Sequence, residues 1–208
     1  MTRADSTAEA RVFDVAPRGI GGKPPEAAGG PEMTEEALLE GLRVGTLEAY
    51  EVLMERFEAP LYRFFYYSHG HHDLAQDQCG ETFINLLSAI QKMRGDAGCL
   101  KAFIFGVARN VLRRGWRQRR LYSASEAMLA RLSDARPSAY RLAASRQEYQ
   151  RAMAAIEELT EPARQVFLLR FVEELSLAEI SEALDLPLGT VKSYIHRSRK
   201  RLLEMLRE

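Results

Sequence analysis

The chain has 208 residues, 46% of them hydrophobic, so it can bury one large core or two small ones. No apolar run reaches the roughly 18 residues of a membrane span, and Asp5 and Glu9 occupy a start with no apolar segment, so we expect neither membrane insertion nor a secretory signal. The 29 Lys and Arg residues balance 29 Asp and Glu residues, and this zero net charge by itself argues against a polyanionic partner. Cys79 and Cys99 are too few for a disulfide framework and favour a cytoplasmic location.

The beginning of the chain is rich in glycine and proline. Five of the 14 glycines and four of the 8 prolines precede residue 32. Such a segment buries too little apolar surface to offset the loss of chain entropy on folding. We therefore expect residues 1–33 to form a disordered extension.

Helical apolar spacing begins at Thr34, and almost nothing in the chain alternates with period two, so we expect an all-α fold. Thr34 is placed to cap a short helix that ends at Val44, and Thr46 is placed to cap the next helix. Pro60 is expected to end or kink that second helix. These signals predict the first helices of a domain over about residues 34–120.

The later helices of this domain are separated by a glycine-rich break. Asp73 followed by Gln76 is similar to a capping box and predicts a helix start. The apolar positions behind it recur at spacings of three and four, at Cys79, Phe83, Leu86, Leu87 and Ile90. Residues 95–98 interrupt the pattern, and Leu100 resumes it.

A second helical domain is expected over residues 145–208, after a polar linker at residues 121–144. Pro162 is tolerated in the first turn of a helix that follows Thr160 and continues through Phe171. Two helical domains joined by a linker are the predicted architecture.

A helix-turn-helix is predicted inside this second domain. Ser176 and Glu179 form a capping box, which predicts a short helix directly after Ser176. Asp185, which tolerates a left-handed backbone, and Pro187 predict a tight turn, and Gly189 opens the last helix. A short capped helix, a tight turn and a longer helix are the layout of a DNA-binding helix-turn-helix.

The last helix is predicted to present a cationic face. Its inward positions are Val191, Ile195, Ser198 and Leu202. Its outward positions are Thr190, Lys192, Ser193, His196, Arg197 and Lys200. Side chains in the first turn suit base edges, and the later cations suit phosphates. The alternative is an ordinary amphipathic hairpin whose basic end interacts favourably with its own helix dipole.

A second cationic segment lies at residues 109–120, which contain six arginines, Asn110, Trp116 and no acidic residue. Arginine with interleaved amide and aromatic side chains suits phosphate neutralisation and contact with unstacked bases. Alternatively, Trp116 packs in the core and the arginines keep a helix end soluble; both interpretations can hold in part. Residues 32–58 carry eight glutamates against two arginines and are not a DNA surface. The zero net charge thus hides segregated charges, and local cationic surface sets phosphate affinity.

Both domains resemble one family, in the same order along the chain. Residues 50–64, 77–83 and 105–111 resemble conserved region 2 of a sigma-70-type factor. Residues 159–170, 187–193 and 196–202 resemble its region 4. A build from these two regions is similar to the extracytoplasmic-function (ECF) group of alternative sigma factors, which assigns residues 34–120 to region 2 and residues 145–208 to region 4.

The resemblance implies a promoter-specific initiation factor with no catalysis and no cofactor of its own. Region 2 would bind the clamp helices of the largest subunit of core RNA polymerase and read the promoter −10 element as a melted single strand. Region 4 would bind the polymerase flap and the −35 duplex. The family also implies an anti-sigma factor as a regulatory partner.

Matching positions carry these implied roles to individual residues. Asp77 and Glu81 would bind core polymerase. The −10 set is Lys92, Arg94, Arg109, Asn110, Arg113 and Arg117, with the loop at residues 91–98 at the edge of a pocket for a flipped-out base. The −35 set is Thr190, Lys192, Ser193, His196, Arg197 and Lys200.

The chain departs from the family at several of these helices. Gly80 replaces a usual glutamine in mid-helix, where glycine costs about 1 kcal/mol relative to alanine, and Gln78 and Cys79 stand where apolar residues are common. Phe103 replaces a common tryptophan. Arg114 replaces a usual aspartate, which predicts a missing ion pair and a more basic surface.

Other functions have weaker sequence support. His69, His71 and His72 with Cys79 offer Zn²⁺ or Ni²⁺ ligands, but a loop between helices is polar anyway, so metal binding is not expected. Redox sensing by Cys79 and Cys99 is a further alternative, disfavoured because Cys79 lies on an apolar face. No catalytic motif is present, and an ordinary helix-turn-helix regulator leaves residues 34–120 without a function.

Overall fold

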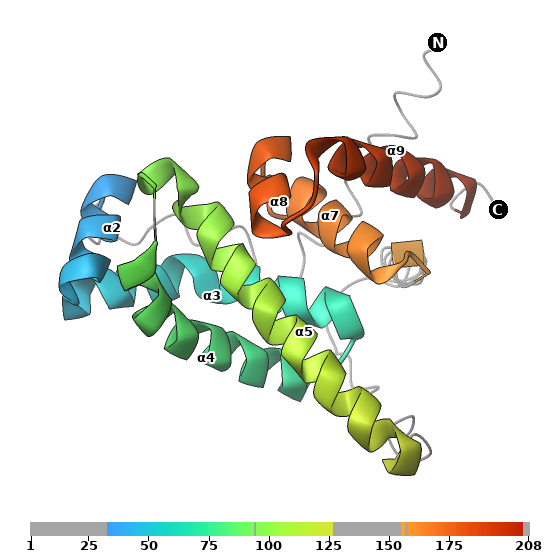
Figure 1. The fold of residues 1–208 in the computed structure, drawn as a ribbon, viewed down its shortest axis with the longest axis horizontal. Helices are drawn as coiled ribbons and strands as arrows, with labels where there is room; N and C mark the ends of the chain where they lie inside the picture. Colours follow the sequence, from blue (N-terminus) through green and yellow to red (C-terminus); the bar gives the residue numbers. More distant parts are fainter. Residues whose placement is uncertain (1–32, 94, 127–154, 157, 206–208) are drawn as a thin grey trace, which may run out of the picture. The chain divides into compact units, whose positions relative to one another are not determined.

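The structure is a computed structural model that describes residues 33–93, 95–126, 155–156 and 158–205, with the main chain alone for residues 116–126, 203 and 205. The described residues form helices joined by short turns, with no β-strand among them, and divide into two compact units (Figure 1). The all-α fold predicted from the sequence is confirmed. The expected disordered extension, apart from Met33, and most of the expected linker lie outside the described residues.

The first unit contains the expected succession of helices. Its elements are α2 (Glu35–Val44), α3 (Leu47–His69), α4 (His72–Ala89), the 3-10 helices η1 (Ile90–Lys92) and η2 (Ala97–Cys99), and α5 (Leu100–Glu126). The helix α5 begins at the predicted residue and continues past the expected domain boundary at residue 120, so the first residues of the expected linker are helical.

The core of the first unit joins α3, α4 and α5. Phe64 of α3 and Phe105 of α5 are fully buried, and their rings meet edge to face with centroids 5.6 Å apart. Burial of a phenylalanine side chain contributes roughly 1.5–3 kcal/mol, and an aromatic pair adds to this. Further buried side chains around the pair are Leu61, Phe65, Leu86, Ile104, Val111 and Leu112.

Of the two outcomes expected at Pro60, a helix end or a kink, the helix end is wrong, because α3 runs through Pro60 as one helix of 23 residues. A proline inside a helix removes one backbone hydrogen bond and costs about 3 kcal/mol or more. Leu53 before the proline and Leu61 after it are both buried in the core. Burial on both sides of Pro60 offsets this cost, which the local sequence alone does not reveal.

The predicted capping box at Asp73 is also wrong. Gly70, with φ 76°, ends α3 in a left-handed conformation, and α4 begins at His72 with His71 at the N-cap. The turn between the two helices is therefore shorter than expected, and Asp73 lies inside the first turn of α4. There its carboxylate interacts favourably with the helix dipole instead of capping it.

The second unit contains α7 (Glu161–Phe171), α8 (Leu177–Ala183) and α9 (Leu188–Met205). Its buried core includes Ile156, Leu159, Phe167 and Leu202, with Phe171 packed against it. The helix α7 packs along α9, and α8 contacts both. This arrangement is the predicted helix-turn-helix, with α9 as its second, longer helix.

The local signals of this unit are confirmed. The Ser176 backbone N–H donates to Glu179 Oε2 at 2.7 Å, and the Glu179 N–H donates to Ser176 Oγ at 3.2 Å, which completes the capping box. Asp185 has the predicted positive φ, 48°. Glu174, between α7 and α8, also has a positive φ, 59°, which the sequence did not indicate. The helix α9 begins one residue before the predicted Gly189.

Among the residues that the structure places, no helix combines the length and the apolar character needed to cross a membrane.

Candidate nucleic-acid interface

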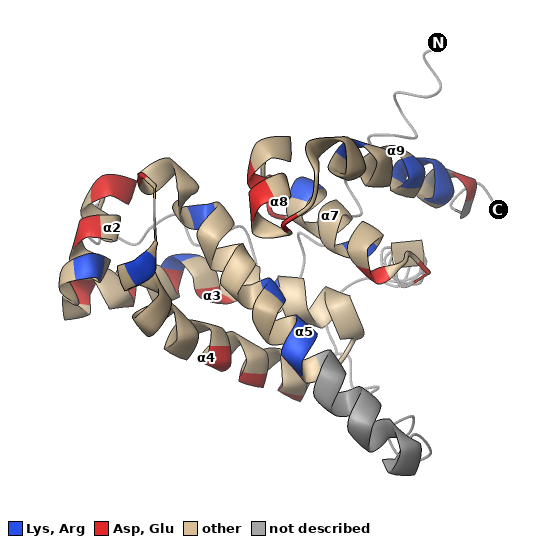
Figure 2. Cartoon of the chain, in the orientation of Figure 1, with Lys and Arg blue, Asp and Glu red and all other residues tan. Residues whose placement is uncertain are grey.

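The helix α9 presents the polar face that the sequence predicts. Val191, Ser198 and Leu202 are buried and Ile195 is half-buried. Lys192, Ser193, His196, Arg197 and Lys200 are exposed, and Thr190 is half-buried. The blue residues in Figure 2 follow α9, whereas α8 carries red ones. The six candidate −35 residues therefore all reach solvent from one helix.

Arg197 is held in place on this face. Its Nε donates to the Ser193 carbonyl oxygen at 3.3 Å, and its guanidinium carbon lies 5.2 Å from the centre of the Tyr194 ring. A cation above an aromatic face is attracted by the ring quadrupole, worth about 0.5–1 kcal/mol at an exposed site. These contacts restrict the side chain before any ligand binds, which lowers the entropy cost of binding.

The positive charge of α9 is least compensated at Lys192 and Arg197. Arg201 pairs with Glu158 at 3.2 Å and Lys200 lies 3.9 Å from Glu204. Lys192 and Arg197 have no acidic partner within the part of the chain that the structure describes. These two side chains, one in the first turns of α9 and one near its middle, are thus expected to attract phosphate most strongly.

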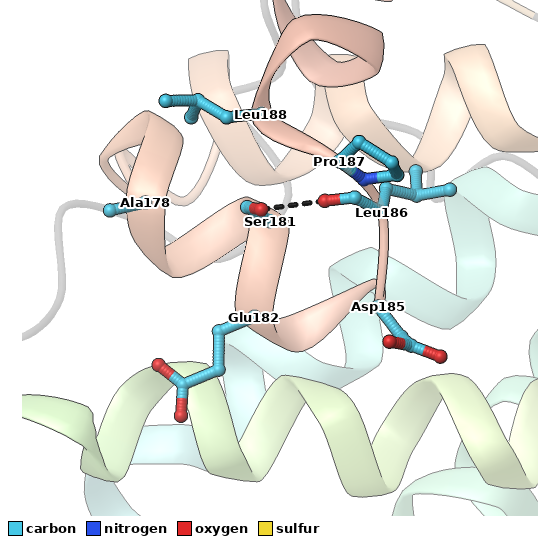
Figure 3. A pocket seen from close by; sticks show the side chains of 7 residues that line it. All are labelled: Ala178, Ser181, Glu182, Asp185, Leu186, Pro187 and Leu188. Atoms are coloured by element: carbon cyan, nitrogen blue, oxygen red, sulfur yellow. Dashed lines mark hydrogen bonds between the residues drawn. The ribbon is translucent and has the colours of Figure 1, made fainter.

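The turn that leads into α9 has the opposite charge. A shallow hollow there is lined by Ala178, Ser181, Glu182, Asp185, Leu186, Pro187 and Leu188. In Figure 3 the hydrogen bond from Ser181 Oγ to the Leu186 carbonyl oxygen, 2.6 Å long, closes the turn. The Glu182 and Asp185 carboxylates lie on the side of the hollow away from Leu188 (Figure 3). These acids disfavour phosphate, so the cationic face of α9 is the better DNA surface.

The helix α5 presents only part of its predicted cationic set as freely exposed side chains. Asn110 and Arg113 are exposed, Arg109 is half-buried, and the Arg117 and Trp116 side chains lie outside the described residues. Val111 and Leu112 between them are buried. This alternation places Asn110 and Arg113 on the outer face of α5.

Arg114, which stands where the family usually has an aspartate, forms an ion pair of its own. Its guanidinium lies 3.0 Å from the Glu81 carboxylate of α4, and both side chains are about half exposed. Arg114 of α5 therefore forms its ion pair with a residue of the neighbouring helix α4. The predicted loss of the aspartate's ion pair stays a prediction. Glu81 was predicted to bind polymerase, so a candidate polymerase contact and a candidate DNA-binding helix are directly joined.

The loop between α4 and α5 has a buried base and exposed sides. Met93 and Ala97 are buried, whereas Lys92 is exposed at the end of η1. Arg94 lies outside the described residues.

Comparisons with known proteins agree with this arrangement. The family model for sigma-70 region 2 matches residues 53–122, and the model for sigma-70 region 4 matches residues 149–202, in the predicted order. The chain belongs to the sigma-70 family. Proteins of this family are DNA-binding factors of transcription initiation. The domain limits drawn from the sequence remain predictions.

Curated relatives of this sigma-70-family chain are ECF factors. SigW of Bacillus subtilis is 47% identical over 53 residues, which span 26% of this chain and 28% of SigW. SigX of Bacillus subtilis is 25% identical over 169 residues, covering 77% of this chain and 87% of SigX. The sigma-E factor of Haemophilus influenzae is 25% identical over 179 residues, covering 81% and 93% of the two chains. The predicted resemblance to the ECF group is confirmed.

Two solved structures share the fold of this sigma-70-family chain. CnrH, solved with the cytosolic domain of CnrY, has a TM-score of 0.61 at 20% identity, over 83% of this chain and 96% of CnrH. RpoE of Bartonella quintana, solved with the anti-sigma factor NepR, has a TM-score of 0.62 at 21% identity, over 77% and 98%.

The outer face of α4 contains apolar residues that sequence reasoning missed. Asp77 and Glu81 are exposed one turn apart, and Ile84, in the following turn, is 69% exposed. Leu87, expected on the buried face, is 48% exposed. Periodicity alone placed Leu87 in the core, whereas packing buries only Leu86 and Ile90 at this end of the helix. Acidic and apolar side chains together suit a protein partner better than DNA.

The alternative histidine and cysteine sites gain no support from their surroundings. The His72 Nδ1 lies 2.6 Å from the Tyr62 hydroxyl, and among the described residues no three His, Cys, Asp or Glu side chains gather as a metal site would require. Burial raises the pKa of the Cys79 thiol to about 12, and the Glu58 carboxylate adds to the shift. Such a thiol stays protonated near neutral pH and is therefore a poor redox nucleophile.

Proposed function

We propose that this sigma-70-family chain is an ECF-type sigma subunit that binds core RNA polymerase and directs it to specific promoters. The cationic face of α9 binds the −35 duplex, and α5 with the preceding loop captures the −10 strand. The chain performs no catalysis itself. The proposal rests on one joint observation. The first helical unit carries its own cations and is followed by a helix-turn-helix with an exposed cationic face, in the order of regions 2 and 4.

The proposed −35 contacts divide by position along α9. Thr190 and Ser193 belong to its first turns, where side chains reach base edges in the major groove. Arg197, held by Ser193 and Tyr194, is suited to bidentate binding of a guanine. The remaining residues of the set, Lys192, His196 and Lys200, contact phosphates or neighbouring bases.

The proposed −10 contacts belong to the first unit. Asn110 and Arg113 offer an amide and a cation to unstacked bases and phosphates, and Arg109 and Arg117 extend this set along α5. Lys92 and Arg94 belong to the loop that edges the pocket for a flipped base. A single strand offers its base faces and edges, so this mode suits DNA that polymerase has already melted.

The proposed polymerase contact is the outer face of α4. Asp77 and Glu81 supply acidic groups for the clamp helices, and Ile84 and Leu87 supply an adjoining apolar surface. The second unit, which corresponds to region 4, binds the flap of core RNA polymerase. The Bartonella quintana RpoE structure contains an anti-sigma factor, and we propose an anti-sigma partner for this chain as well.

Promoter-specific transcription tests the proposal. The purified full chain is added to core RNA polymerase with a library of genomic fragments, and run-off transcripts are mapped. The expected result is a defined set of start sites that neither component produces alone. Sequence-specific duplex binding by the chain alone, without any polymerase-dependent transcript, would contradict the proposal and favour an ordinary helix-turn-helix regulator.

A further inference from the structure

Arg43, in the last turn of α2, is bonded to both flanks of the loop between α4 and α5. Its Nη2 donates to the Gly95 carbonyl oxygen at 3.2 Å. Its own carbonyl oxygen accepts a hydrogen bond from Gln91 Nε2 at 2.6 Å. Gln91 belongs to η1 and Gly95 precedes η2, so one residue of α2 holds both sides of the loop.

Backbone geometry and burial act together with these two bonds to fix the described part of the loop. Gly95 has a φ of 126°, which side-chain-bearing residues rarely adopt, and its carbonyl oxygen accepts the hydrogen bond from Arg43. Met93 and Ala97 are buried and anchor the loop from below. The described part of the loop is thus fixed at its base by burial and at its sides by Arg43.

The helix α2 combines acidic side chains with a buried apolar face. Its acidic side chains disfavour DNA, yet the helix contacts both η1 and η2, and its residues Leu38, Leu39 and Leu42 are buried. An acidic helix beside a DNA-reading loop repels phosphate, so its position there needs a structural reason. The contacts of α2 with η1 and η2 provide that reason, because they support the loop between them.

We propose that α2 is the platform of this loop and that Arg43 is a positioning residue for the capture of one base of the −10 strand. The inference rests on the proposed function, in which the loop edges the pocket for a flipped base. A preformed pocket selects a base without first having to order its own wall, so loss of the support weakens capture of that base in particular. Arg43 acts through Gly95 and Gln91 and does not itself contact DNA.

Holoenzyme binding to single strands tests this proposal. The probe is a fluorescent oligonucleotide with the −10 non-template sequence of a promoter mapped by run-off transcription, and a series of the same strand with one abasic site at each position. Arg43→Ala is expected to weaken binding of the intact strand about fivefold, the contribution of one hydrogen bond of typical strength. The difference from wild type is expected to disappear when one particular base is removed.

Two further variants complete the test. Gln91→Met removes the second bond at similar side-chain volume, so it is expected to affect the same strand position even if Arg43→Ala folds poorly. Arg56→Ala removes the same charge from an exposed residue of α3 and is expected to show no base-dependent change. Thermal unfolding of each full chain identifies any variant that does not fold.

The outcomes separate this inference from the proposed function. The positioning role would be overturned if the variants lost binding equally on every abasic strand, or if Arg43→Ala and Gln91→Met both bound the intact strand as the wild type does. Promoter-specific transcription by the wild type would remain in both cases. Absence of promoter-specific transcription by the wild type would overturn the proposed function first.

Discussion

The two cationic helices hold their charges in different ways. The face of α9 is organised within the helix itself, since Arg197 is held by Ser193 and Tyr194 of the same turn. The face of α5 is connected to other elements, since Arg114 pairs with Glu81 of α4 and the adjoining loop is held by Arg43 of α2. A duplex-binding helix can enter a groove as a rigid rod, whereas a strand-capturing surface needs walls contributed by several elements.

Arg197→Ala tests the self-contained face of α9 and has the largest expected effect. Loss of a bidentate arginine contact is worth about 1–3 kcal/mol of base discrimination. Holoenzyme binding to the mapped promoter and to −35 variants is expected to lose most of its selectivity. The unfolding free energy of the chain is expected to fall by no more than about 1 kcal/mol, the value of the lost contact with Tyr194. The matched control is Arg201→Ala, whose side chain pairs with Glu158 and which is expected to preserve selectivity. Unchanged selectivity in Arg197→Ala would place base readout elsewhere on α9.

Gly115→Ala tests the dependence of α5 on its neighbours. A Cβ at this position would approach Gln78 Nε2 of α4 to 2.6 Å, so the amide end of this buried side chain must shift. Such overpacking costs about 1–3 kcal/mol, and replacing a mid-helix glycine by alanine returns about 1 kcal/mol. The unfolding free energy is therefore expected to fall by up to about 2 kcal/mol, measured by chemical denaturation of the full chain. A rise in the unfolding free energy would show that the α4–α5 packing yields at this point and that α5 is less constrained than proposed.

Gly80→Ala serves as the opposite case on α4. A Cβ there meets nothing within 4 Å, and α4 is continuous through Gly80. Replacement of an exposed mid-helix glycine by alanine is therefore expected to raise the unfolding free energy by about 1 kcal/mol, on the same denaturation assay. Destabilisation would mean that Gly80 has a packing role that its surroundings do not indicate.

The Glu81–Arg114 pair has the smallest expected effect on stability. Exposed ion pairs contribute about 0.2–1 kcal/mol, and salt screens them further. A double-mutant cycle with Glu81→Gln and Arg114→Ala is expected to give a coupling energy in this range that falls at high salt. A larger, salt-independent coupling would show that the α5 surface depends on this pair far more strongly than its exposure implies.

Local sequence signals predicted the second unit well. The capping box at Ser176 and Glu179, the positive φ of Asp185 and the inward face of α9 each depend on residues within a few positions of one another. Short-range hydrogen bonds and helical periodicity decide such features, so they can be predicted from the sequence. The two-region resemblance was legible for the same reason, because its motifs are local.

The first unit shows where local signals fail. Pro60 predicted a helix end or a kink, and the helix does not end there, because leucines on both sides are buried in the core. Asp73 predicted a cap, but the left-handed Gly70 shortened the turn before it. At Pro60, burial in the core outweighed a local preference of a few kcal/mol. At Asp73, a glycine three residues earlier outweighed a cap preference of about 1 kcal/mol.

The sequence by itself determined the all-α fold, the helix-turn-helix and the segregation of charge behind a net charge of zero. Only the tertiary structure decided that Arg114 meets Glu81, that Ile84 and Leu87 face outward, and that Arg43 holds a loop whose Gly95 lies 52 residues away. Hydrogen bonds and packing between such distant residues depend on how helices dock, and docking is set by the shape of the whole core. The charges of each helix could be counted in advance, but their partners could not.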